Sequence, residues 1–156
     1  MAPERFSNFN FEVILSYGSE ASILNLAQRA SFSQVSGLEI NVASVELVEG
    51  GYNRGVRRLV GKATNPPLVL KRGLTDDRGF WDWIQACFTG TYPVPYVTGE
   101  VWVYPPFPDP FSQTIAKWRF TNGMATKVKA PDLNAVSAAI PIEELTIAHE
   151  GLERIQ

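Results

Sequence analysis

Apolar and polar residues alternate along much of this chain, and a period of two residues is typical of half-buried β-strands. The pattern predicts strands at 9–15, 38–47, 68–73, 97–103, 116–120 and roughly 136–149. In the second of these the phase slips near Ala43 and Ser44, which indicates a β-bulge in one long bent strand. The strands on either side of the proline-rich turn at 104–110 should pair as a hairpin. Pro141 has no backbone donor, so it belongs at an edge, a bulge or a strand start.

One amphipathic helix is expected between Thr75 and Gly90. Thr75 or Asp76 can cap its first turn, and Gly90 can end it. The spacing i, i+4, i+7, i+8 predicts that one helix face packs on a sheet. That face consists of Phe80, Ile84, Cys87 and Phe88, with Trp81 beside them and Trp83 nearer its margin.

The segment from Glu49 to Pro67 is predicted to be a sharp turn followed by a polar, basic loop. Its glycines favour a tight turn or a close approach to another backbone. From Gly50 to Arg72 there are six basic residues and no acidic one. Such segregation suits a surface that meets an acidic surface on another copy, and it equally suits a loop that is merely solvated. If this stretch meets acidic surface on another copy, reversing Arg57 and Arg58 to glutamate should weaken that contact.

Length and composition favour a single domain spanning residues 1–156. A chain of this size is expected to bury about 70% of its unfolded surface. Hydrophobic residues make up 45% of the chain, which is too large a share for a disordered protein. No apolar run approaches the ~18 residues of a membrane-spanning helix. No signal peptide is apparent, and the single Cys87 fits a reducing cytosol. The expected fold is a β-barrel or sandwich of about seven strands, mostly antiparallel, with one flanking α-helix.

Candidate catalytic chemistry is sparse, so we expect no enzyme, no cofactor and no metal site. The glycine and lysine pattern at 55–64 departs from a phosphate-binding loop, since Ala63 stands where a hydroxyl is needed. His149 is the sole histidine and is expected at a strand end on the surface. Adjacent Glu143 and Glu144 should point to opposite faces of a strand. Cys87 is expected to be a small core residue.

Six short signatures lie in register over nearly the whole chain, at 31–39, 49–53, 70–75 with 81–83, 118–123, 129–135 and 143–152. Together they resemble the tail tube protein family of contractile phages and phage-derived contractile injection systems. That family is related in fold to the Hcp protein of type VI secretion. The sequence departs from the family at 105–110, where many members have a short Asp/Gly turn.

The resemblance implies a structural subunit that forms six-membered rings, stacked into a hollow rigid tube inside a contractile sheath. Implied partners are further copies of the chain, the sheath protein, baseplate and tube-capping proteins, and a cargo effector or phage DNA in the lumen. The implied location is cytoplasmic assembly followed by a place in a phage tail or injection particle, with no membrane insertion by this chain alone. The residues implied to contact neighbouring subunits and the adjacent ring are Glu49, Gly50, Gly51, Tyr52, Asn53, Arg54, Arg57, Arg58, Lys62 and Asn65.

One alternative from another class is a monomeric β-sandwich that binds carbohydrate or peptide. Aromatic side chains are the usual contacts of such modules. The candidates here are Tyr92, Tyr96, Trp102 and Phe107.

Overall fold

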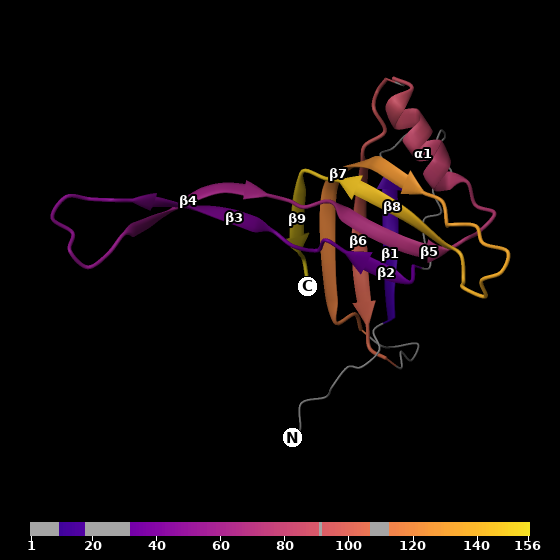
Figure 1. Ribbon diagram of the computed structural model, residues 1–156, viewed down its shortest axis with the longest axis horizontal. Coiled ribbons are helices and arrows are strands. Elements are labelled where there is room, and N and C mark those ends of the chain that lie inside the picture. The colour runs from indigo at the N-terminus through magenta and orange to yellow at the C-terminus, as the bar shows by residue number, and fades with distance from the viewer. Residues whose placement is uncertain (1–9, 18–31, 91, 107–112) are drawn as a thin grey trace.

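The computed structural model describes residues 10–17, 32–90, 92–106 and 113–156. These residues form nine strands and one helix, which are shown in Figure 1. The elements are β1 (Asn10–Tyr17), β2 (Gln34–Ser36), β3 (Asn41–Leu47), β4 (Arg57–Thr64), β5 (Leu68–Gly73), α1 (Gly79–Phe88), β6 (Val97–Tyr104), β7 (Ala116–Lys129), β8 (Ile142–Ala148) and β9 (Gly151–Arg154).

Seven of the described strands form one antiparallel sheet that folds into two layers (Figure 1). The strand order is β1-β6-β7-β8-β5-β2, and β9 also pairs with β7. The first half of β7 pairs with β6 and β9, and its second half pairs with β8. One strand therefore belongs to both layers. The predicted class, mainly β and antiparallel with one flanking helix, is confirmed.

The bend in β7 lies at Asn122, where the strand passes from one layer to the other. Asn122 has a φ of 50°, a left-handed conformation that asparagine tolerates better than most residues. Its side-chain Nδ2 donates to Glu150 Oε2 at 2.7 Å, and the backbone N–H of Glu150 donates to the Thr121 carbonyl at 3.0 Å. The connection between β8 and β9 thus holds the bend in place.

The core lies between the two layers, because alternate residues of the strands point inward. Leu70 on β5 lies opposite Leu145 on β8, and both are fully buried. Phe120 on β7 packs so close to Gly99 on β6 that a Cβ there would collide with its ring. Gly99 is therefore required by packing. The buried core consists of Val13, Leu15, Phe32, Leu68, Leu70, Phe80, Trp83, Val97, Val101, Phe120, Ala125, Leu145 and Ile147.

Helix α1 begins at Gly79, later than the Thr75 or Asp76 that the sequence suggests. It ends near Gly90, which has a φ of 75° as expected for a helix stop. Trp83 is fully buried and donates its indole N–H to the Pro95 carbonyl at 2.9 Å, so it lies at the centre of the packed face. Phe88 is 70% exposed. The buried stripe follows i, i+3, i+4 and i+7 from Phe80, which leaves position i+8 outside it.

Strand boundaries differ from the sequence prediction mainly near the C-terminus. The predicted strand at 136–149 begins only at Ile142, directly after Pro141, and the chain from 130 to 141 forms no strand. Pro141 therefore marks a strand start. The predicted strand at 38–47 is confirmed from Asn41 onward. The register shifts between Val42 and Ser44, where the bulge was expected, but Val42 pairs with Ala63 and Ser44 with Val60, so the extra residue lies in β4. The proline-rich turn was predicted at 104–110, and most of it lies outside the described residues.

Candidate assembly interface

Strands β3 and β4 form a separate two-stranded sheet that projects from one end of the molecule (Figure 1). Val45 lies opposite Leu59 and Leu47 lies opposite Arg57, in an antiparallel register. The prediction of a basic loop after the glycine-rich turn is therefore wrong, because residues 57–64 form the second strand of this hairpin. Backbone pairing with β3 satisfies its hydrogen bonds. We call residues 41–64 the projecting hairpin.

The projecting hairpin exposes apolar side chains on both of its faces. Val45 and Leu59 share one face, and Val60, which is 86% exposed, lies on the other with Val42. An isolated two-stranded hairpin is marginally stable in water, and contiguous exposed apolar surface marks an interaction site. The exposed apolar residues on and beside the hairpin are Ile40, Val42, Val45, Leu47, Val48, Tyr52, Val56, Leu59 and Val60. These side chains stay exposed beside the rest of the described residues.

All ten sequence-predicted contact residues lie on this hairpin or at its root. The structure brings the turn residues together at the tip, where the Tyr52 N–H donates to the Glu49 carbonyl at 3.3 Å. The other residues follow the second strand back toward the body. In chain order the set is Glu49, Gly50, Gly51, Tyr52, Asn53 and Arg54 at the tip, Arg57, Arg58 and Lys62 in β4, and Asn65 at the root.

Much of the basic charge on the hairpin is balanced within the hairpin itself. Arg57 Nε lies 2.8 Å from Glu49 Oε2, and the Arg57 guanidinium carbon lies 4.9 Å from the centre of the Tyr52 ring. Arg58 pairs with Glu46 at 3.0 Å across the strands. These pairs are exposed, so each contributes about 0–1 kcal/mol. The proposed contact of Arg57 and Arg58 with acidic surface on another copy stays a prediction.

The root of the hairpin is tied to the body by backbone and side-chain contacts. Gly37 has a φ of 89° and packs so tightly on the Pro67 carbonyl that a Cβ would collide with it. The Asn65 side chain donates to the Glu150 carbonyl at 3.2 Å. These contacts fix the direction in which the hairpin leaves the sheet.

His149 belongs to this root and is buried, 9% exposed, so the expectation of a surface position is wrong. Its Nε2 lies 3.1 Å from the Pro66 carbonyl and its Nδ1 lies 3.1 Å from the Gly151 carbonyl. The ring also contacts Phe120, with 5.9 Å between ring centres. A carbonyl oxygen only accepts hydrogen bonds, so a neutral imidazole donates to one of the two. Sequence reasoning missed this role because Pro66 and Phe120 come from distant segments.

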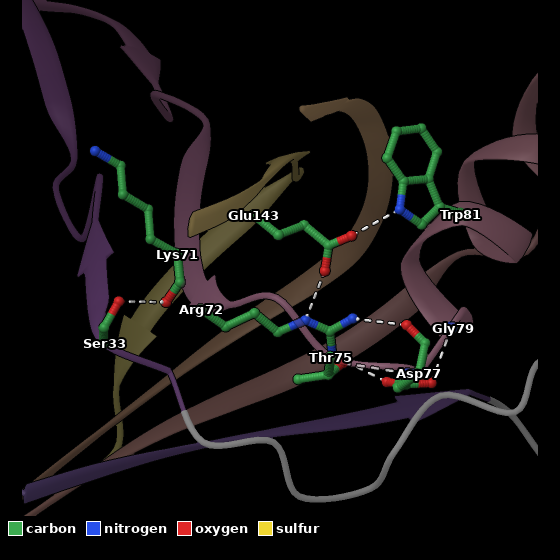
Figure 2. A network of polar contacts seen from close by, with 8 residues as sticks. All are labelled: Ser33, Lys71, Arg72, Thr75, Asp77, Gly79, Trp81 and Glu143. Carbon is green, nitrogen blue, oxygen red and sulfur yellow. Dashed lines mark hydrogen bonds and ion pairs between the residues drawn. The ribbon is translucent and has the colours of Figure 1, made fainter. Parts of the chain in front are cut away.

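A second polar cluster, around Arg72, fixes α1 on the sheet (Figure 2). Arg72 is buried and donates from Nε to Glu143 Oε2 at 2.8 Å and from Nη1 to Asp77 Oδ2 at 2.9 Å. Trp81 Nε1 donates to the other oxygen of Glu143 at 2.6 Å, and the Arg72 guanidinium lies 3.7 Å from the Phe80 ring centre. The cluster joins β5, β8 and the start of the helix.

Asp77, an acidic member of this cluster, is held as a carboxylate. Burial opposes ionisation of Asp77, but hydrogen bonds from the Gly79 backbone and Arg72, with the charge of Arg72, outweigh burial and lower its pKa below 3.8. Glu143 is 2% exposed while Glu144 faces outward toward Lys71, which confirms that the two point to opposite faces.

Residues 10–17, 32–90, 92–106 and 113–156 show neither a cluster of metal ligands nor an activated thiol. In that part of the chain no three His, Cys, Asp or Glu side chains meet as a metal site. Burial raises the pKa of the Cys87 thiol, which disfavours a reactive thiolate. None of the described helices has the length and apolar character needed to cross a bilayer.

The aromatic side chains proposed for ligand binding do not form one described platform. Tyr92 and Tyr96 are exposed, while Trp102 is partly buried and donates its indole N–H to Glu100 at 2.7 Å. Lys117 covers the Trp102 ring at 4.2 Å from its centre. Phe107 lies outside the described residues.

Solved structures of injection-system proteins share this fold. A chain of an extracellular contractile injection system, the PVC sheath–tube complex in its extended state, superposes with a TM-score of 0.77 at 18% identity, covering 98% of this chain and 93% of that one. A chain of the anti-feeding prophage baseplate gives 0.75 at 17% identity, covering 94% and 92%. Hcp1 from Flavobacterium johnsoniae gives 0.52 at 13% identity, covering 92% and 94%. No curated protein matches the sequence significantly.

Family membership rests on the sequence itself. The family model described as T4-like virus tail tube protein gp19 matches residues 7–153. The match spans the projecting hairpin, both layers of the sheet and the helix. The chain therefore belongs to the T4-like virus tail tube protein gp19 family, whose members are structural subunits of a tube.

Proposed function

We propose that this chain, acting as one domain over residues 1–156, forms rings that stack into the inner tube of a contractile injection system or contractile phage tail. The projecting hairpin carries the proposal. It exposes Val45, Leu59 and Val60 on a two-stranded extension that has no core of its own. A contact with a neighbouring copy covers that surface and stabilises the hairpin.

The open edges of the sheet support the same proposal. Among the described strands, β1 and β2 are the ends of the strand order, so one side of each carries unpaired backbone groups. Free edges of this kind promote pairing with another chain. Neighbours around a closed ring remove them, and six copies per ring is the number that the family resemblance implies.

The proposed partners follow from this role. The matched solved chains come from a sheath–tube complex, a baseplate and a tube-terminating cap. By analogy, this chain contacts a sheath protein outside the tube and baseplate and cap proteins at its ends. A cargo effector or phage DNA passes through the lumen. The chain has a structural role without catalysis and resides in the assembled particle after assembly in the cytoplasm.

The test measures assembly of the purified chain by sedimentation velocity and negative-stain electron microscopy over a range of concentrations. We expect rings or tubes whose abundance rises with protein concentration. The double variant Val45→Lys/Leu59→Lys should stay monomeric, because it places charge on the covered face. Circular dichroism and urea denaturation check its fold, because Val45 lies opposite Leu59 and two lysines there repel each other across the hairpin.

The matched control is Tyr92→Lys, which adds charge at an exposed aromatic away from the hairpin. It should assemble like the wild type. A wild-type chain that stays a single monomeric species at every concentration contradicts the proposal. A thermal stabilisation of that monomer by sugars or peptides would instead favour the ligand-binding module.

A further inference from the structure

An apolar groove of about 230 Å³ opens at the end of the core where β1 begins and β6 ends (Figure 1). Its walls come from both layers of the sheet. On one side Phe11 of β1 pairs with Val103 of β6, and Val101 of β6 pairs with Trp118 of β7. On the other side stand β2 and the residues directly after it. The lining residues are Phe11, Val35, Leu38, Val101, Val103 and Trp118.

This groove continues the core and is not a patch on the surface. Val101 is 2% exposed, and Phe11, Val35 and Leu38 pack against the buried cluster. Protein interiors contain few voids larger than a water molecule, which occupies about 30 Å³. A buried water also needs two to four polar partners, and these walls are apolar. The walls therefore favour an apolar side chain as occupant.

A small-molecule ligand fits the groove less well than a side chain does. Ligand sites usually place a few polar groups among their apolar walls to orient the ligand. Of the six lining side chains only Trp118 carries a polar atom. A phenyl ring needs no polar partner, and burying one is favourable by about 1.5–3 kcal/mol.

The residues before β1 contain a phenyl ring on the required side. In β1 the odd-numbered side chains face the core: Val13 and Leu15 are buried and Phe11 lines the groove, whereas the even-numbered residues are more exposed. Successive strand residues alternate between faces and rise about 3.3 Å each. Phe9 lies outside the described residues, but it is the next odd-numbered position, about 7 Å from Phe11 in an extended chain.

The path of the chain at Asn10 brings this segment to the mouth of the groove. Asn10 pairs with Tyr104, and its side-chain Nδ2 donates to the Pro106 carbonyl at 3.2 Å. These contacts hold the start of β1 beside the end of β6, where Val103 lines the groove. Phe9 is bonded directly to Asn10, so no long connection has to be ordered to place its ring there.

Residues 107–112 are a second possible source of an aromatic side chain, since they contain Phe107 and Phe111. They follow Pro105 and Pro106, and β6 ends at Tyr104. Proline removes a backbone donor and interrupts strand pairing, so the alternation of β6 does not extend to Phe107. The alternation of β1 reaches Phe9 without such a break.

We propose that Phe9 of the same chain fills this groove and closes the end of the core, with residue 9 continuing the alternation of β1. The contact lies within one chain and exists before assembly, so it goes beyond the proposed tube function and does not depend on it.

The first experiment is photo-crosslinking from position 9. The full chain carries Phe9→benzoylphenylalanine, is irradiated and is digested for mass spectrometry. We expect a product of monomer mass whose link joins position 9 to a peptide that contains Val35 and Leu38, or to Trp118. The matched control is Asn8→benzoylphenylalanine, which has the opposite parity and should give much less of this product.

The second experiment is a double-mutant cycle, followed by thermal unfolding at a concentration where the chain sediments as a monomer. Phe9→Ala should lower the unfolding midpoint by about 5 °C, whereas Asn8→Ala should leave it unchanged. Phe9→Leu keeps an apolar side chain and should retain most of the wild-type midpoint. Leu38→Ala combined with Phe9→Ala should lower the midpoint by less than the sum of the two single changes, because the side chains share one contact.

A monomer-mass link to the groove together with non-additive losses establishes the contact. A link that joins two chains shows that another copy fills the groove, which overturns the proposal. Equal links from positions 8 and 9, no link, or additive losses also overturn it. So does a link to the groove from Phe107→benzoylphenylalanine in place of position 9. None of these results changes the assembly measured by sedimentation, so the tube proposal is tested separately.

Discussion

His149 Nε2 lies 3.1 Å from the carbonyl oxygen of Pro66, and this contact joins the end of β8 to the root of the projecting hairpin. The other ring nitrogen faces the carbonyl of Gly151 at the same distance. A single buried side chain thus connects the second layer of the sheet, the β8–β9 turn and the hairpin. The direction of the hairpin depends on it.

Replacing His149 with alanine should weaken both folding and assembly. The substitution removes the ring contact with Phe120 and leaves a half-buried carbonyl without its donor, which costs about 1–3 kcal/mol of unfolding free energy. Urea denaturation measures the loss, and sedimentation measures assembly under conditions where the variant is folded. Normal assembly at reduced stability would show that Asn65 and Gly37 alone orient the hairpin.

Replacing Arg72 with methionine should be one of the most destabilising changes in the chain. It leaves Glu143 buried without its cation, and breaking a buried pair in this way costs about 3–5 kcal/mol. The neighbouring Lys71→Met removes a looser, partly exposed pair with Glu144 at 3.8 Å and should cost about 1 kcal/mol or less. Equal losses in urea denaturation of the two variants would contradict a structural role for the Arg72 cluster.

Stability should fall at acid pH partly through Asp77. Its pKa is lowered in the folded state below 3.8, so the stabilisation is present above that value and is lost as pH falls through the folded pKa. Asp77→Asn should therefore flatten the dependence of unfolding free energy on pH in this range. The adjacent and more exposed Asp76→Asn serves as control, and a profile for Asp77→Asn that matches the wild type would exclude the effect.

Replacing Gly99 with alanine should destabilise the core. The added Cβ collides with the Phe120 ring and with Leu15, and overpacking of this kind costs about 1–3 kcal/mol. Gly73→Ala is the matched control, because a Cβ on that strand glycine meets nothing within 4 Å. Thermal unfolding of both variants distinguishes packing from the general effect of losing a glycine.

The two-layer sheet was predictable because most of its strands turn one face toward the core and the other toward solvent. Val13 and Leu15 on β1, and Leu68 and Leu70 on β5, alternate with more exposed residues, and the sequence shows that period directly. The phase slip after Val42 was also visible, but it does not mark an inserted residue in β3, because the extra residue of the bulge lies in β4.

The second strand of the hairpin was not predictable by the same reasoning. Strand β4 begins Arg57-Arg58-Leu59-Val60 and has no alternation, because both of its faces are exposed in the monomer. A strand that lies outside the core has no buried face, so its sequence need not alternate between apolar and polar residues. The exposed apolar residues of β4 are the ones that we propose contact another copy.

The buried polar contacts were invisible for another reason. Arg72 and Glu143 are 71 residues apart, and His149 and Pro66 are 83 residues apart. No local sequence spacing can therefore predict either contact. Only the register of β5 against β8 brings the first pair together. Sequence reasoning could place Glu143 on one face of its strand, but it could not identify Arg72 as its cationic partner.

Strand β7 runs unbroken through both layers, with Asn122 as its only left-handed residue among the described positions. Its two halves are hydrogen-bonded to different neighbours, so separating the layers would require peeling β6 and β9 from one half or β8 from the other. A load applied to one layer is consequently carried to the other through covalent backbone. The two layers should therefore respond to force as one unit, which is the mechanical property that the wall of a tube under load needs.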